Sequence, residues 1–461
     1  MTALVLEQAM RPGAVDAKTS TRPAAAAAQL AGRIAARDAT VAVVGLGHVG
    51  LPLALAAAQA GFRIVGLDTD RGKVACVAAG RSPLNHVEPK VLQSLVAEGR
   101  LMAATDPGCL AEAEIVLICV PTPLGRDGTP DLGHVRAAVG TAARVMRPGG
   151  LLVLESTTWP GTTRQVVAPL LEARGWRIGE HVFLGYSPER EDPGNARFRT
   201  ADIPKLVAGA DDASRQLALA LYGAIVARVV PVETLEIAEA AKLAENVFRA
   251  VNIALANELK LGFAAMGLDA WQVIEAAATK PFGYIPFWPG PGPGGHCIPV
   301  DPVYLAWAAR RHGAAMPLLD TAVAINAAAP AHVAARLESA LGGLRGRRVL
   351  LLGLGYKRNI ADVRDSPALV LIEALEARGA SIGYHDPLVP EIPHTPEHPG
   401  LMGRRGLGWA AALRAVWDAA LIVTDHDGVD YAALRDRLPL VVDTRNSYAR
   451  RGLDADGVLP A

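Results

Sequence analysis

The sequence has few of the features that mark several large classes of protein. Its four cysteines, Cys76, Cys109, Cys119 and Cys297, are scattered and form no Cys-x-x-Cys pair, which argues against a zinc site or a disulfide framework. Lysine plus arginine number 46, as do aspartate plus glutamate, so no net positive charge would attract nucleic acid. The sequence contains no run of 18 apolar residues, so no membrane span is predicted. We expect no metal, nucleic acid or membrane, and scattered thiols fit a reducing cytoplasm.

What the chain does contain begins with a strand, a glycine-rich turn and a helix. An uninterrupted apolar run predicts a buried strand over Thr40–Val44, and a helical pattern follows over Leu51–Ala60. A second strand, Arg63–Leu67, ends at Asp68. Because the turn between the first strand and the helix reads Gly-x-Gly-x-x-Gly, this order is the fingerprint of a dinucleotide-binding unit.

The residues of that turn have separate roles in such a unit. Gly45 permits the tight turn, and Gly47 lets a pyrophosphate reach the helix N-terminus. Gly50 lets the helix and strand pack closely. Asp68 would accept hydrogen bonds from the adenosine ribose and would repel a 2′-phosphate, which favours NAD over NADP.

Three further apolar strands each run into a polar loop. They are predicted at Glu114–Val120, Leu151–Leu154 and His181–Tyr186. In an open parallel sheet, ligands bind at the carboxyl ends of the strands. We therefore expect Thr122, Thr157 and Glu189, which follow these strands, to lie on the same rim as the glycine turn.

The middle of the chain has a different pattern. From Glu233 to Ala265 proline is absent and apolar residues recur at helical spacing, which predicts one long helix spanning a domain. A loop over Pro281–Asp301 follows, and then further helix to about Leu341.

A second strand and glycine turn begin near residue 347, but here Arg358 replaces the third glycine. We expect a degenerate unit that binds a different phosphate ligand. Its predicted helix is Pro367–Arg378, and its predicted strands are Arg347–Leu352, Ser381–His385, Leu421–Thr424 and Leu440–Val442. The predicted fold class is α/β, with two Rossmann-like α/β domains joined by a central all-helical domain.

The loop Pro291–Asp301 carries one cysteine, Cys297, in a run of glycine and proline, with Asp301 four residues later. Glycine lets the backbone approach a ligand closely, and flanking prolines stiffen the loop. A thiol held there suits covalent catalysis. The local string is equally compatible with a tight turn and an ordinary buried cysteine. His296 is its chain neighbour and points the other way in an extended segment, so we interpret it as a loop-shaping residue.

Several of these strings together resemble the UDP-glucose/GDP-mannose dehydrogenase family, the nucleotide-sugar 6-dehydrogenases. The matching strings are GLGHVG, VPTP, EST, SPER, AAKLAENVFRAVNIALANEL, PGPGPGGHCIPVDP, GLGYKRNIADVRDSP and VDTRN, in family order over about residues 40–447. The resemblance implies oxidation of a sugar's primary alcohol to a carboxylate with two NAD per turnover. One departure is His48, where the family commonly has an aromatic residue.

The resemblance also implies roles for particular residues. Cys297 would attack the aldehyde to give a thiohemiacetal and then a thioester. Lys242 and Asn246 would stabilise negative charge on the substrate oxygen. Asp301 with Thr122 would position a water for proton transfer, and the general base of thioester hydrolysis would be Glu189.

Binding residues follow from the same resemblance. For the cofactor NAD they are Gly45, Gly47, Gly50, Asp68, Thr122, Thr157 and Arg364. For the UDP-sugar they are Glu189, Arg190, Lys242, Asn246, Lys357 and Arg445. Composition and pattern predict a flexible tail and short helix over 1–38, with the helix at Gln29–Arg37. With the resemblance, the rest divides into an NAD-binding domain over 39–231, a helical dimerisation domain over 232–341, and a UDP-sugar-binding domain over 342–461.

The sequences of two loops favour one sugar among the candidate UDP-sugar substrates. The strings over Ser187–Asn195 and Phe287–Gly292 resemble the UDP-N-acetylglucosamine 6-dehydrogenase branch. UDP-glucose and UDP-N-acetylmannosamine remain alternatives, as do a two-electron hydroxyacid dehydrogenase and a non-catalytic nucleotide-sugar sensor. The long central helix, and pairing through it in the family, suggest a homodimer or a higher homo-oligomer.

Overall fold

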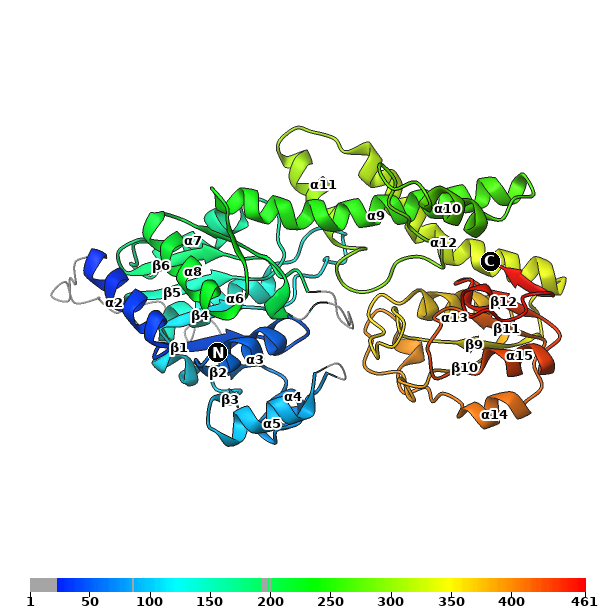
Figure 1. Cartoon of the computed structure of the whole chain (residues 1–461), viewed down its shortest axis with the longest axis horizontal. Coiled ribbons are helices and arrows are strands. Elements are labelled where there is room, and N and C mark those ends of the chain that lie inside the picture. Colours follow the sequence, from blue (N-terminus) through cyan, green and yellow to red (C-terminus); the bar gives the residue numbers. More distant parts are fainter. Residues whose placement is uncertain (1–22, 85–86, 192–197, 199) are drawn as a thin grey trace, which may run out of the picture. The chain divides into compact units, whose positions relative to one another are not determined.

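The computed structural model describes residues 23–84, 87–191, 198 and 200–461 (Figure 1). Residues 1–22 of the predicted tail lie outside this part of the chain. The contacts divide the molecule into two compact units, Met1–Leu243 and Ala244–Ala461. The boundary falls inside one long helix, α9 (Leu235–Ala265), and each unit is described by itself below.

The first unit contains an eight-stranded sheet in the order β3-β2-β1-β4-β5-β6-β7-β8. Its strands are β1 (Thr40–Val44), β2 (Arg63–Leu67), β3 (Leu101–Ala104), β4 (Ile115–Ile118), β5 (Gly150–Leu154), β6 (Val182–Tyr186), β7 (Lys205–Gly209) and β8 (Val229–Pro231). The neighbouring pairs from β3 to β6 are parallel, with Val41 opposite both Ile64 and Ile115. All five residues of β1 are buried, as its apolar run predicts.

This strand order determines where a ligand can enter. The chain moves outward from β1 through β2 to β3, then returns to the other side of β1 with β4, β5 and β6. The connections therefore diverge between β1 and β4, and such a switch point opens a crevice at the carboxyl ends of the strands. The glycine turn after β1 and the loop after β4 lie on its two sides.

The far edge of this sheet departs from the predicted parallel arrangement. Strand β7 runs antiparallel to β6, and β8 runs parallel to β7. Neither strand was predicted, because the apolar segments of β7 and β8 are short and give only a weak strand pattern.

Helices pack on the faces of this sheet. The main ones are α2 (Pro23–Ala36), α3 (Gly50–Gln59), α4 (Arg71–Ala78), α5 (Pro89–Ala97), α6 (Gly133–Val145) and α8 (Asp212–Ile225). The first of them contacts α8, and its Leu30 and Ile34 belong to the same apolar core as β1 and β4. The helix predicted at Gln29–Arg37 therefore exists but begins six residues earlier, at Pro23.

Four helices follow the first sheet. They are α9 (Leu235–Ala265), α10 (Ala270–Ala278), α11 (Asp301–Arg311) and α12 (Pro317–Leu341). In the second unit, the Asn326 amide joins α12 to α9 by donating from Nδ2 to Ala250 O at 2.9 Å, and Asn257 Oδ1 of α9 accepts from Gly290 N of the loop before α11 at 2.9 Å. Helix α12 is long and apolar enough to cross a membrane, but the buried core helix of a globular protein can have the same length and composition. Val333, Ala334 and Leu337 of α12 lie in an apolar core of the second unit.

The second unit contains a parallel sheet in the order β10-β9-β11-β12-β13. Its strands are β9 (Arg348–Leu352), β10 (Ser381–His385), β11 (Ala419–Ile422), β12 (Val441–Asp443) and β13 (Val458–Pro460), and its helices include α13 (Pro367–Ala377), α14 (Trp409–Arg414), α15 (Tyr431–Arg437) and α16 (Ser447–Arg450). Apolar residues fill both faces of the sheet. The predicted class, two α/β sheets with a long helix between them in the chain, is confirmed.

The glycine turn after β9 is closed by protein atoms. The carboxylate of Asp386, at the end of β10, accepts hydrogen bonds from Leu354 N at 2.6 Å and Gly355 N at 3.0 Å. Its other oxygen accepts from Leu388 N and Val389 N. The ring of His426, which is fully buried, contacts the same carboxylate at 3.1 Å. This turn therefore uses its acidic residue to hold the fold.

The electrostatics of Asp386 agree with that role. Burial alone would raise the pKa of Asp386, but the hydrogen bond and charge of His426 and the backbone N–H groups lower it to about 2. Since the pKa in the folded state lies below the ordinary value, the ionised carboxylate stabilises the fold at neutral pH. That stabilisation is lost as the pH falls from about 4 through about 2.

We predict that Asp386→Asn lowers the free energy of unfolding by about 2–3 kcal/mol at pH 7, because an amide nitrogen cannot accept from the buried N–H groups. Urea unfolding at pH 7 and in acid checks this. The loss should shrink below about pH 4, where the wild type also loses the carboxylate's contribution. The control, Asp436→Asn at an exposed site on α15, should change stability by less than about 0.5 kcal/mol. Equal effects of the two substitutions would contradict this account.

Candidate active site

The three glycines of the first turn meet different surroundings. Gly45 has φ +96°, and a Cβ there would lie 2.7 Å from Cys119 O. A Cβ on Gly50 would overlap the carbonyl oxygen of Gly45. At Gly47, by contrast, a Cβ would meet nothing within 4 Å. Two glycines are thus required by the protein itself, while Gly47 borders open space, as a turn that receives a pyrophosphate requires.

Asp68 lies where the sequence predicts, directly after β2. Its Oδ2 accepts from Leu46 N at 2.8 Å, and its Oδ1 accepts from Asp70 N at 2.9 Å. A carboxylate offers about four acceptor positions, so these two bonds leave capacity for ribose hydroxyls. The surroundings of Asp68 thus differ from those of Asp386, whose oxygens accept four backbone bonds and contact a histidine.

Two of the predicted cofactor residues meet on the rim of the first sheet. Thr122, after β4, donates from Oγ1 to Thr157 O, after β5, at 2.8 Å. The neighbouring Ser156 donates from Oγ to Val120 O at 2.7 Å. These bonds join the two loops on the far side of the crevice from the glycine turn.

Glu189 follows β6 on the same rim. Its Oε1 accepts from the backbone N–H groups of Arg190, at 2.7 Å, and of Glu191. The side chain of Arg190 donates from Nη1 to Pro204 O at 2.7 Å. The second carboxylate oxygen of Glu189 lies 3.8 Å from Lys205 Nζ, a cation that the sequence analysis did not single out.

Lys242 is a buried side chain on α9. One turn earlier, the buried carboxylate of Glu239 accepts from Gly161 N at 2.5 Å, Thr163 N at 2.8 Å and Thr163 Oγ1 at 2.6 Å. Burial raises the pKa of Glu239 to about 7, although the hydrogen bonds from Thr163 and Gly161 oppose the rise. This contact fixes the start of α9 to the first unit, and no sequence pattern indicated it.

In the second unit the structure brings Asn246 and Asp301 together. Asn246 Nδ2 donates to Asp301 Oδ2 at 2.5 Å, although 55 positions separate them in the chain. Asp301 is buried and begins α11, and its N–H donates to Cys297 O at 2.9 Å. Cys297 is exposed. One polar side chain of α9 is thus tied to the helix that directly follows the cysteine.

Glycines near Cys297 have close protein neighbours, so the packing of this loop itself requires residues without a Cβ. A Cβ on Gly294 would lie 2.6 Å from Tyr356 Cβ, and one on Gly290 would lie 2.7 Å from Arg445 Nη1. Gly295 has φ +79°, and its N–H donates to Arg364 O at 2.9 Å. These glycines let the loop pack against the turn after β9 and against Arg445.

Basic side chains gather at the carboxyl ends of β9, β11 and β12. Arg445 donates from Nε to Val423 O at 2.8 Å, and Arg364 pairs through two nitrogens with Asp362. Lys357 lies in the turn after β9. Burial, together with the charges of Arg445 and Arg336, lowers the pKa of Lys260 on α9 to about 8.

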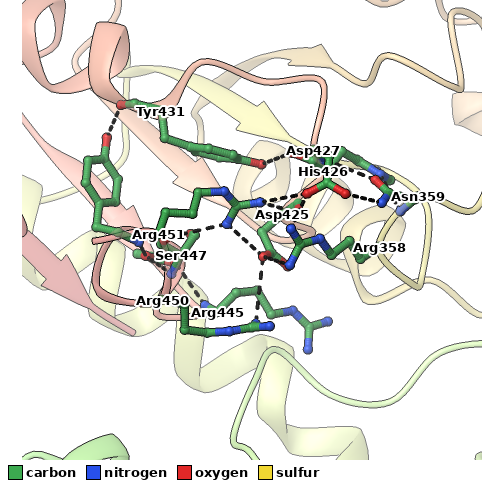
Figure 2. A network of polar contacts seen from close by, with 12 residues as sticks. Arg358, Asn359, Asp425, His426, Asp427, Tyr431, Arg445, Ser447, Arg450 and Arg451 are labelled. Carbon is green, nitrogen blue, oxygen red and sulfur yellow. Dashed lines mark hydrogen bonds and ion pairs between the residues drawn. The ribbon is translucent and has the colours of Figure 1, made fainter. Parts of the chain in front are cut away.

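Figure 2 shows the aspartate that organises much of this edge. The buried carboxylate of Asp425 lies 2.9 Å from Arg451 Nη1 and 3.6 Å from Arg358 Nη1. Arg358 also pairs with Asp427, which Asn359 contacts at 2.5 Å. The residue that replaces the third glycine is thus an anchored arginine. An arginine-rich edge of this kind suits phosphate recognition.

The predicted residues are divided between the two units. Thr122, Thr157, Glu189 and Lys242 belong to the first; Asn246, Cys297, Asp301, Lys357, Arg364 and Arg445 belong to the second. Direct contacts join Thr122 to Thr157 and Asn246 to Asp301. In the described part of the chain, no group of three or more His, Cys, Asp or Glu side chains is arranged to hold a metal ion.

The open glycine turn of the first α/β unit indicates a dinucleotide-dependent dehydrogenase, and the arginine-rich edge of the second unit indicates a separate site for a phosphate ligand. Family models match three consecutive segments: the NAD binding domain (residues 39–226), the central domain (236–328) and the UDP binding domain (350–450) of the UDP-glucose/GDP-mannose dehydrogenase family. The chain belongs to this family.

Individual relatives agree with the assignment. The chain is 35% identical over 359 residues to UDP-N-acetyl-D-glucosamine 6-dehydrogenase of Pseudomonas aeruginosa, covering 77% of this chain and 84% of the relative. It is 34% identical to UDP-N-acetyl-D-mannosamine dehydrogenase of Salmonella typhi, covering 89% and 99%. A solved UDP-glucose dehydrogenase from Pyrobaculum islandicum superposes with a TM-score of 0.80 at 30% identity, covering 92% and 96%. The chain is thus an NAD-dependent nucleotide-sugar 6-dehydrogenase, and its UDP binding domain supports a UDP-sugar substrate.

The glycine turn gives a prediction that separates binding from folding. Gly47→Ala should leave thermal unfolding unchanged and raise the KM for NAD about 10-fold or more, because the added methyl group enters the space needed by the pyrophosphate.

Gly50→Ala is the matched control. It should lower stability by about 1–3 kcal/mol or more without any ligand, because the methyl group overlaps Gly45 O. Calorimetry without cofactor and initial-rate kinetics check both variants. Equal destabilisation by the two substitutions would contradict the separation.

Proposed function

We propose that the chain oxidises the 6-hydroxyl of a UDP-N-acetylhexosamine, first of all UDP-N-acetylglucosamine, to the UDP-uronic acid through a covalent intermediate on Cys297. The observation that supports this best is the group at the start of α11. An exposed thiol lies four residues before a buried aspartate, and Asn246 of the central helix is hydrogen-bonded to that aspartate.

In the first oxidation the sugar's C6–H bond breaks, the hydride leaves and the hydroxyl loses its proton, which gives an aldehyde. When bound at the glycine turn, NAD would supply the hydride acceptor for both oxidations. A water held by Thr122 and Asp301 takes up the hydroxyl proton. Lys242 and Asn246 stabilise the negative charge that develops on the oxygen, since a buried ammonium and an anchored amide are preorganised donors.

The second oxidation is covalent. The Cys297 sulfur adds to the aldehyde carbon, the oxygen gains a proton, and a thiohemiacetal forms. Loss of a second hydride and of the hydroxyl proton gives a thioester. Glu189 then removes a proton from the attacking water, and the C–S bond breaks to release the carboxylate and the thiol. One alcohol and one water thus become one carboxylate, with two hydrides transferred.

The binding roles complete the proposal. Gly45, Gly47, Gly50, Asp68, Thr122, Thr157 and Arg364 serve the cofactor, while Lys357 and Arg445 hold the diphosphate, with Glu189 and Arg190 near the sugar. The domain limits 39–231, 232–341 and 342–461 belong to the same proposal, as does a cytoplasmic location. A homodimer through α9 is supported by Phe248 and Leu255, apolar side chains of this helix that are each 51% exposed.

The choice of an N-acetylhexosamine is supported by the loops over Ser187–Asn195 and Phe287–Gly292 and by relatives named for such sugars. UDP-N-acetylmannosamine and UDP-glucose are the alternatives, since relatives of the chain carry those names too. Sites that hydrogen-bond a substituent discriminate strongly against sugars that lack it.

We predict that Cys297→Ala still binds NAD and the UDP-sugar but makes no uronate. Calorimetric titration and mass spectrometry of the products check this. Cys76→Ala, which removes a partly exposed thiol of α4, is the control and should keep wild-type turnover. Normal uronate formation by Cys297→Ala would exclude the covalent mechanism.

A panel of UDP-N-acetylglucosamine, UDP-N-acetylgalactosamine, UDP-N-acetylmannosamine and UDP-glucose tests the substrate and the stoichiometry together. We expect the highest kcat/KM for UDP-N-acetylglucosamine and two NADH per sugar. One NADH per sugar would indicate a two-electron dehydrogenase, and none with any sugar would indicate a non-catalytic sensor. A preference for UDP-glucose would overturn the choice of sugar alone.

A further inference from the structure

A buried pair of opposite charges lies beneath Glu189 in the first unit. Lys205, at the start of β7, directs its ammonium group to Glu155 Oε2 at 2.7 Å. The Lys205 side chain is 6% exposed and the Glu155 side chain 0%. Taking two charges out of water costs free energy that their attraction seldom exceeds, so stability alone does not explain this buried pair.

The partners of Lys205 supply another reason. Its ammonium group also donates to Pro188 O at 3.1 Å and lies 3.8 Å from Glu189 Oε2. It thus contacts both the backbone just before Glu189 and one oxygen of its carboxylate. The other oxygen accepts from the N–H groups of Arg190 and Glu191. The Glu189 carboxylate is therefore held from two sides.

Lys205 is itself held on the side away from Glu189. Tyr222 of α8 donates a hydrogen bond from its hydroxyl to Glu155 Oε1, and its ring centroid lies 5.2 Å from Lys205 Nζ. Although burial lowers it, the charges of Glu155 and Glu189 raise the pKa of Lys205 above its ordinary value, so the ammonium stays charged. A fixed cation beside a carboxylate keeps that carboxylate in place and available as a base.

We propose that Lys205, anchored by Glu155 and Tyr222, is a positioning residue that holds the Glu189 carboxylate for hydrolysis of the Cys297 thioester. The inference rests on the covalent mechanism proposed above. Hydride transfer does not use Glu189 in that mechanism, so loss of Lys205 should slow hydrolysis selectively.

The test uses stopped-flow measurement of NADH and mass spectrometry of acid-quenched protein, with UDP-N-acetylglucosamine or the panel sugar of highest kcat/KM. For Lys205→Met we expect a burst of two NADH per active site, a steady state about 10²-fold slower than wild type, and a uronoyl adduct on Cys297. Lys205→Arg, which keeps the charge, should recover part of the rate. Wild-type hydrolysis by Lys205→Met, or equal losses in burst and hydrolysis rates, would overturn the proposal.

Two further variants guard against misfolding and test the route through Glu189. Glu155→Gln with Lys205→Met removes both charges of the Lys205–Glu155 pair, so neither position is left with an unpaired ion. This double variant should show the same adduct if Lys205→Met does not fold. Adding Lys205→Met to Glu189→Gln should slow hydrolysis no more than about 2-fold beyond Glu189→Gln alone, because a residue that acts through another is not additive with it. Multiplying losses would contradict the proposal.

The outcome also distinguishes this proposal from the one on which it rests. If the wild type released one NADH per sugar, the covalent mechanism would fail, and the role of Lys205 with it. If the wild type releases two and Lys205→Met forms no adduct while hydrolysis stays fast, the positioning role alone fails.

Discussion

The candidate site depends most on the hydrogen bonds that the buried carboxylate of Glu239 accepts. This carboxylate lies in the first part of α9 and accepts three hydrogen bonds from Gly161 and Thr163, in the segment that follows β5. Without Glu239, these buried donors would have no hydrogen-bond partner, and such groups are costly to leave unsatisfied. The three hydrogen bonds therefore fix the helix to the segment after β5. Because α9 is one continuous helix, fixing its start also orients Lys242, one turn further on.

The two glycine turns show how one backbone pattern can serve two purposes. At both, an aspartate directly after the following strand accepts a hydrogen bond from a backbone N–H of the turn, Asp68 at the first and Asp386 at the second. In the second turn, His426 and two more backbone groups complete the coordination of that aspartate. The first carboxylate keeps acceptor capacity for a ligand, whereas the second has become part of the core. The replacement of the third glycine by Arg358 thus accompanies a change in the role of the turn's aspartate, from keeping acceptor capacity for a ligand to holding the fold.

Buried charge is used in both units to place side chains. Lys205 and Glu155 form a pair beneath Glu189, and Asp425 collects the guanidinium groups of Arg358 and Arg451 beside the turn after β9 (Figure 2). Such pairs add little to stability, since desolvation offsets most of the attraction. They fix the direction of groups that would otherwise be mobile, which is what preorganised binding and catalysis require.

Much of the fold was readable from the sequence. The predicted limits of β1, β2 and β10 agree with the structure because uninterrupted or alternating apolar runs specify strands locally. The apolar segments of β7 and β8 are too short to give a clear strand signal, and their direction, opposite to that of β6, depends on how the chain returns after β6. The sequence by itself determined the glycine turn, the long helix and the cysteine loop. Only the tertiary structure decided that Asn246 is hydrogen-bonded to Asp301 and Lys205 is paired with Glu155. Packing selects polar partners that are distant in the chain, and local sequence patterns do not encode these pairings.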